Sequence, residues 1–147
     1  MTFQSRPDTI TWKIHLHKPP EQVYDLIASN DGRAAFWAES AMELEKHIQF
    51  VFPDGQIWLG KILDTQPGTL FSVEYYGGSK ATFRLSSDGK SGTLLELTDE
   101  GVPAADRTEV IAGWVSVLMA LKAAAEFGVD LRNHDSEYTW DKGFADN

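Results

Sequence analysis

GWVSVLMALKAAAEFG, at residues Gly113–Gly128, is almost free of charge, because only Lys122 and Glu126 in it are ionised. A helix on the surface of a globular protein usually buries one apolar stripe and shows polar residues elsewhere. At about 100° per residue, this stretch has one broad face of large apolar residues and a second face of small residues. It is shorter than the ~20 consecutive apolar residues that span a membrane. We therefore expect a long helix, from about Ala105 to Gly128, that is covered on two sides within a domain.

Composition narrows the class of protein. The chain has 147 residues and 42% hydrophobic content, which suits a single domain over residues 1–147. It has no cysteine, so disulfides, thiol nucleophiles and thiolate metal sites are excluded. The net charge is −9 and the basic residues are scattered singly, which argues against nucleic-acid or membrane partners. Polar residues rather than a basic and apolar leader follow Met1, so we expect a cytoplasmic protein.

The order of elements predicts an α+β fold. TITWKIHLH at residues 9–17 alternates as a half-buried strand does, and two short helices follow, of which the second carries Phe36 and Trp37. From Met42 to Glu100 the period is two, with turn sequences between short runs, which indicates a meander of five strands. The prediction is a curved antiparallel sheet of about six strands wrapped around the long C-terminal helix.

The first run of the meander leaves one question open. Its apolar residues share one parity and are expected on the inner face of the sheet: Met42, Leu44, Ile48, Phe50 and Phe52. Lys46 has the same parity, so it is either a cationic anchor inside the domain or a residue released to water by a bulge or break at Lys46–His47.

Several segments together resemble a known family. They are PPEQVYDLIASNDGRAAFWAES at residues 19–40, GKI at 60–62, QPG at 66–68 and GWVSVLMALK at 113–122. They resemble the activator-of-heat-shock-ATPase homologue (AHSA-type) family of the START-like, birch-pollen-allergen-like (SRPBCC) superfamily, and DLRNHDSEYTWDKGFADN at 130–147 looks like the tail of a bacterial subgroup. The resemblance covers essentially the whole chain. It implies a helix-grip fold with a deep, mostly hydrophobic cavity between the sheet and the long helix, and thus a class of site rather than a reaction.

Candidate ligand-binding residues are the apolar and aromatic ones expected on the facing walls of that cavity. Trp58 is set aside, because Ile57, Leu59 and Leu63 compete for the same inner face. The candidates are Trp12, Ile14, Phe36, Trp37, Phe50, Tyr75, Phe83, Leu95, Trp114, Val117, Leu118 and Leu121.

The sequence predicts no metal site, cofactor or catalytic residue. His15 and His17 share a strand face that should point to water, and no third ligand follows at a suitable spacing. His134 lies in the tail beside Asp135, where a structural hydrogen bond is the favoured role. No motif for a nucleophile elbow, a zinc protease or a phosphate loop is present.

These observations favour binding of a small hydrophobic molecule, of lipid-, aromatic- or polyketide-like type, without assigned catalysis. The alternative is a cofactor-free cyclase or hydrolase for an aromatic or polyketide-like substrate, for which Lys46, Tyr75 and Tyr76 are the only polar candidates. The third reading is a chaperone-regulating interaction module. The tail, residues 129–147, contains EYTWDKGF and is too apolar to stay free, so we expect it to dock on its own domain or on a partner subunit of a homodimer.

Overall fold

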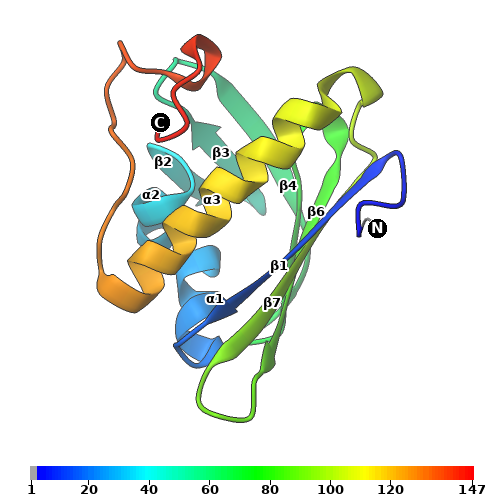
Figure 1. Ribbon diagram of the computed structural model, residues 1–147, viewed down its shortest axis with the longest axis vertical. Helices are drawn as coiled ribbons and strands as arrows, with labels where there is room; N and C mark the ends of the chain where they lie inside the picture. The colour runs from blue at the N-terminus through cyan, green and yellow to red at the C-terminus, as the bar shows by residue number, and fades with distance from the viewer. Residues whose placement is uncertain (1–2) are drawn as a thin grey trace.

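The computed structural model describes residues 3–147 and has one antiparallel sheet of seven strands, in the order β1-β7-β6-β5-β4-β3-β2. The long helix α3 lies across one face of this sheet, and two short helices follow the first strand (Figure 1). The α+β helix-grip fold predicted from the sequence is therefore confirmed. The strands are β1 Thr9–Leu16, β2 Ser40–Leu44, β3 His47–Val51, β4 Ile57–Gln66, β5 Leu70–Glu74, β6 Lys80–Ser87 and β7 Thr93–Glu100. The α-helices are α1 Pro20–Ala28, α2 Asn30–Phe36 and α3 Arg107–Phe127, and short 3-10 helices are η1 Tyr76–Gly78, η2 Ala104–Asp106 and η3 Trp140–Lys142.

The sheet has seven strands instead of about six because the first run of the meander is a hairpin. Leu44 pairs with His47, and the two residues between them, Glu45 and Lys46, have φ of 52° and 64°. Two successive residues with positive φ form the tight hairpin turn whose twist matches that of the strands. Lys46 is exposed in this turn, so the chain breaks there and the Lys46 ammonium group stays in water instead of entering the interior.

The turn also reverses the parity of the preceding strand. Met42 and Leu44 are 53% and 75% exposed, whereas Ile48 and Phe50 are completely buried. The expectation that all five apolar residues of this run share the inner face is therefore wrong for Met42 and Leu44. A tight turn of two residues carries the chain into a new strand, so parity counted through it has no meaning.

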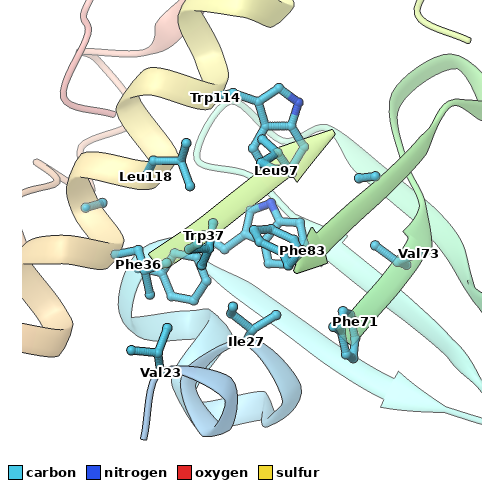
Figure 2. Packing of buried hydrophobic residues seen from close by; sticks show 14 of the residues in the cluster. Val23, Ile27, Phe36, Trp37, Phe71, Val73, Phe83, Leu97, Trp114 and Leu118 are labelled. Carbon is cyan, nitrogen blue, oxygen red and sulfur yellow. The ribbon is translucent and has the colours of Figure 1, made fainter. Parts of the chain in front are cut away.

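One face of α3 packs into the core. Trp114, Leu118 and Leu121 are at most 4% exposed, and Figure 2 shows Trp114 and Leu118 above Trp37 and Phe83. The helix ends where Gly128 adopts the left-handed conformation, with φ of 63°, and its N–H bonds back to the last turn. By length and composition Ala104–Phe127 could cross a membrane, with a mean hydropathy of 1.6. In the fold it is the helix that covers the sheet.

Trp37 is the centre of the aromatic core. The centroid of its ring lies 4.9–5.9 Å from the centroids of five other aromatic rings. Phe36 stacks on it and Phe83 meets it edge-on, and both are seen beside it in Figure 2. Aromatic pairs at this range gain energy beyond the burial of their area. The rings around Trp37 are Phe36, Phe50, Tyr75, Phe83 and Trp114.

The tail, residues 129–147, runs back along α3 on the side of α2 and β2 (Figure 1). Arg132 donates hydrogen bonds to the carbonyl oxygens of Ala34 and Ala38, at 2.6 and 2.8 Å, and pairs with Asp130. Farther along, the Ser116 hydroxyl donates to the Ala145 carbonyl at 3.0 Å. The beginning of the tail therefore contacts α2, and the end of the tail contacts α3.

Candidate functional site

A cavity of about 470 Å³ lies between the first half of α3, the tip of the β3–β4 hairpin, η1 and the tail. Binding sites for small molecules commonly have volumes in this range. From α3 and η2 it is lined by Asp106, Glu109, Val110, Gly113, Trp114, Val115, Ser116, Val117, Met119 and Ala120. The other lining residues are Phe36, Trp37, Phe52, Pro53, Asp54, Gln56, Trp58, Tyr75, Tyr76, Leu131, Arg132, Trp140, Ala145, Asp146 and Asn147.

The floor of the cavity, formed by Trp37, Tyr75 and Trp114, is aromatic with its indole N–H groups already bonded. Trp37 Nε1 donates to the Tyr75 hydroxyl at 3.0 Å, and Trp114 Nε1 donates to Asp99 Oδ2 at 2.8 Å. A buried indole N–H without a partner would cost free energy, so these bonds make the floor stable without a ligand. What the two indoles offer to the cavity is therefore their carbon surface.

Tyr75 gives the floor one polar group. Burial raises the pKa of Tyr75, so its hydroxyl is protonated at neutral pH and cannot act as a base. The hydroxyl oxygen accepts from Trp37, and no acceptor for its proton lies among residues 3–147. A ligand carbonyl or hydroxyl oxygen could accept that proton.

The mouth of the cavity, formed by Asp54, Trp58, Tyr76, Asp106 and Glu109, is more exposed than the floor. The Trp58 ring lies 5.1 Å from the rings of Tyr75 and Tyr76, at angles of 75° and 49°, so the three rings form a corner rather than a stack. Hydrogen bonding to the Asp106 carboxylate raises the pKa of Tyr76. Aromatic surface and carboxylates therefore meet at the entrance.

Five of the twelve residues proposed from the sequence line this cavity, and they come from α2, the end of β5 and α3. They are Phe36, Trp37, Tyr75, Trp114 and Val117. Four others, which are at most 4% exposed, fill the solid core between α3 and the sheet: Phe50, Phe83, Leu118 and Leu121. The large apolar face of α3 packs directly on the sheet, and the cavity lies beside that face, on the neighbouring side of the helix.

The remaining three candidates belong to the other end of the sheet. Trp12 packs against α3, where its Nε1 donates to the Ile111 carbonyl at 3.2 Å. Ile14 and Leu95 are paired on β1 and β7 and line a second hollow, also of about 470 Å³. That hollow is bounded by strand residues alone, many of them charged or polar, and lacks the aromatic floor of the first.

Sequence reasoning missed the hairpin and tail walls. Trp58 lines the cavity, whereas Ile57, Leu59 and Leu63, which were expected to compete with it for the inner face, are 58%, 71% and 42% exposed, so Trp58 should not have been set aside. The sequence signal for this wall was Trp58 itself, an aromatic residue between the aliphatic residues Ile57 and Leu59. No sequence signal placed Trp140 of the tail against the cavity.

The histidines take structural roles. His15 Nε2 lies 2.7 Å from Asp88 on the surface, and no group of three or more metal-ligating side chains occurs in the part of the chain that the structure describes. His134 contacts Glu39 through Nδ1 at 2.6 Å and Asp130 through Nε2 at 2.7 Å. The hydrogen-bond role predicted for His134 is confirmed, with these carboxylates in place of the adjacent Asp135.

Comparison with known proteins identifies the family that matches this chain. The family described as Activator of Hsp90 ATPase homolog 1-like protein matches residues 17–126. The solution structure of the Aha1 dimer from Colwellia psychrerythraea is similar, with a TM-score of 0.73 and 20% identity over 82% of this chain and 97% of that one. No curated protein matches the chain.

Two further solved structures, DynU16 and CalU16, are similar to this chain. DynU16, a protein from the dynemicin biosynthetic locus, has a TM-score of 0.70 and 19% identity over 84% of this chain and 49% of its own. CalU16 from Micromonospora echinospora has a TM-score of 0.63 and 23% identity, over 77% of this chain and 73% of its own. At these identities the likeness establishes the fold and no more.

Proposed function

Because the chain belongs to the Activator of Hsp90 ATPase homolog 1-like family, we propose that it binds a small hydrophobic molecule in the cavity beside α3. The observation that carries this proposal is a cavity of about 470 Å³ whose aromatic floor has its indole N–H groups satisfied internally. Such a surface gains most from contact with an apolar ligand, since no polar atom of the two indoles has to be desolvated anew.

The ligand we propose is lipid-, aromatic- or polyketide-like, with a flat apolar body that packs on Trp37 and Trp114. One oxygen acceptor on the ligand would meet the Tyr75 proton and fix its orientation. A cytoplasmic location and a homodimer are part of the same proposal, the latter supported by the dimeric Aha1 of Colwellia psychrerythraea.

Catalysis is the less favoured function. Lys46, one of three polar groups considered for it, lies in the β2–β3 turn and does not line the cavity. Tyr75 is held protonated by burial. Tyr76 has a raised pKa as well, so neither phenol would supply a base near neutral pH. A chaperone-regulating role is tested separately, by adding the purified protein to an Hsp90 ATPase assay.

The proposal is tested with N-phenyl-1-naphthylamine, a neutral aromatic probe whose emission rises in apolar sites. We expect saturable binding with one probe per chain and quenching of tryptophan emission. Gly113 lines the cavity, and a β-carbon there would lie 4.0 Å from the Trp140 ring. Gly113→Leu should fill the space and weaken binding by about tenfold or more, which corresponds to ~1.4 kcal/mol.

The matched control is Ala112→Leu. It adds a leucine side chain at the neighbouring exposed position of α3, outside the cavity. We expect wild-type affinity from it. Linear, unsaturable probe uptake by the wild type, or equal affinity of the two leucine variants, would refute binding at this cavity.

A further inference from the structure

The cavity that we propose as a ligand site has acidic residues in its otherwise largely apolar lining. Four aspartate and glutamate side chains line it, on three different walls: Asp54 on the hairpin, Asp106 and Glu109 at the start of α3, and Asp146 in the tail. None of the four forms an ion pair with another described residue. Arg132 is the one basic residue of the lining, and its guanidinium is occupied by Asp130 and by the backbone carbonyls of Ala34 in α2 and of Ala38 just after it.

Acidic residues at the start of a helix have an ordinary explanation, since they interact favourably with the helix dipole. That explanation covers Asp106 and Glu109 in part. Asp106 is the N-cap of α3, yet its side chain makes no capping hydrogen bond, so its carboxylate is not used for the role that the position normally serves. Asp54 belongs to the opposite hairpin, outside any helix, and Asp146 lies in the tail. The common property of the four is the cavity and not the helix.

Aromatic rings stand beside these carboxylates at the mouth. Trp58 forms an open corner with Tyr75 and Tyr76, and Phe52 packs on it with 4.4 Å between ring centroids. The faces of tryptophan and tyrosine attract cations, and aromatic corners of this kind bind ammonium groups. Asp106 accepts a hydrogen bond from Tyr76, Asp54 from Gln56 and Asp146 from Asn133, but none of the carboxylates has a cationic partner among the described residues. An aromatic corner next to such carboxylates favours an organic cation over a neutral or anionic group at the same place.

We propose that the ligand is an apolar amine: an aromatic or polycyclic body that reaches the floor, with an ammonium group at the mouth between Trp58, Asp106 and Glu109. This inference rests on the proposed function, because it names the chemical class of ligand for the same cavity. The apolar body supplies contact area on Trp37 and Trp114. The ammonium group neutralises carboxylates that no side chain of the described chain neutralises.

Three naphthalene probes of one shape test the charge preference: 1-naphthylmethylamine, which is a cation at pH 7, 1-naphthylmethanol and 1-naphthoate. Calorimetric titration of the full chain at low salt should give the order amine, alcohol, carboxylate. We expect each step to be about tenfold or more in Kd. Added salt should reduce the advantage of the amine, because screening weakens interactions of partly exposed charges.

Asp106→Asn combined with Glu109→Gln should remove most of the preference for the amine over the alcohol, measured as the ratio of the two Kd values in the same variant. The control pair is Glu21→Gln with Asp25→Asn, which removes the same charge from exposed positions of α1 outside the cavity. It should keep the wild-type order. Because Glu21 lies in the first turn of α1, the control also matches the loss of an acidic residue near a helix start.

The outcomes separate the two proposals. If all three probes bind equally to the wild type, or if the charge order survives the Asp106→Asn, Glu109→Gln pair, the amine proposal is wrong and hydrophobic binding stands. If none of them binds and N-phenyl-1-naphthylamine does not bind either, the proposed function itself fails. The comparison within the wild type requires no variant to fold.

Discussion

Asp99 is a carboxylate at the centre of the fold, and replacing it should stabilise the protein. Its side chain is completely buried on β7, and Trp114 Nε1 donates to its Oδ2 at 2.8 Å. Its Oδ1 and the buried Ser79 hydroxyl make no hydrogen bond of good geometry among residues 3–147, although the Ser79 hydroxyl is near enough to lower the pKa of Asp99 together with Trp114. Burial raises the pKa of Asp99 above its ordinary value of 3.8, and nearby donors offset only part of that rise.

The sign of the pH dependence follows from the raised pKa. Between pH 3.8 and the raised pKa, the folded state holds a proton on Asp99 that the unfolded state has lost. The free energy of unfolding therefore falls as the pH rises through that window and stays lower at neutral pH. Asp99→Asn keeps an oxygen acceptor for Trp114, removes the buried charge and adds a donor that can serve Ser79. We expect a gain of about 1–3 kcal/mol at pH 7, the scale of one buried unsatisfied group.

Urea denaturation followed by tryptophan emission at several pH values between 4 and 8 measures the effect. Each kcal/mol should also raise Tm by about 2–4 °C for a domain of this size. The difference between wild type and Asp99→Asn should shrink toward pH 4. Asp64→Asn, at an exposed position of β4, is the control and should change little. An Asp99→Asn protein that is less stable than the wild type at pH 7 would refute the argument and show that the buried charge itself stabilises the fold.

Four other predictions concern the backbone, the tail and the partner. Gly113→Ala should stabilise α3 by about 1 kcal/mol, because the new β-carbon would meet only a ring of the tail, at 4.0 Å. Gly60→Ala should destabilise the protein by more than about 2 kcal/mol, because its β-carbon would collide with a carbonyl oxygen of β5. Urea denaturation measures both changes. Deleting residues 136–147 should lower the free energy of unfolding by more than about 1 kcal/mol, and an unchanged melting curve with an unchanged oligomeric state would contradict tail docking. Burial lowers the pKa of His134, but hydrogen bonds to Asp130 and Glu39 raise it more, so the net shift is upward. Docking of the tail should therefore weaken as the pH rises above 6.5 and through the raised pKa. Limited proteolysis at several pH values, with His134→Gln as the comparison, measures this. The purified protein should not accelerate an Hsp90 ATPase, and stimulation abolished by a surface variant would overturn hydrophobic binding as its function.

Local patterns predicted most of the fold because each element carries its own signal. The alternation of β1, the turn sequences of the meander and the left-handed Gly128 after α3 are all properties of neighbouring residues. The β2–β3 turn has no such signal. Glu45 and Lys46 lack the Asn-Gly or Asp-Gly sequence that usually marks a turn with two positive φ values, so a break at Lys46–His47 was one of two alternatives and the hairpin turn itself was not predicted.

The candidate site was harder to predict because it depends on which faces remain uncovered. The periodicity of α3 shows that Trp114, Leu118 and Leu121 share a face, but not whether that face meets open space or the sheet. Leu118 and Leu121 are 4% and 0% exposed, so the space beneath them is filled by the side chains of the core. Contacts between residues that are distant in the sequence decide whether this face meets the sheet or open space, and periodicity in a single sequence does not predict such contacts.

The nearly uncharged surface of α3 can now be explained face by face. Trp114 and Leu118 cover the core, whereas Val117 and Gly113 face the cavity. Val115 and Met119 line the same cavity and remain 41% and 48% exposed, although large apolar side chains on a helix normally find cover. A bound apolar body would remove part of that surface from water, at ~25 cal/mol for each Å². Polar residues on this side of the helix would have made the chain more soluble and left the cavity without an apolar wall, so the unusual composition of α3 is the feature that hydrophobic ligand binding requires.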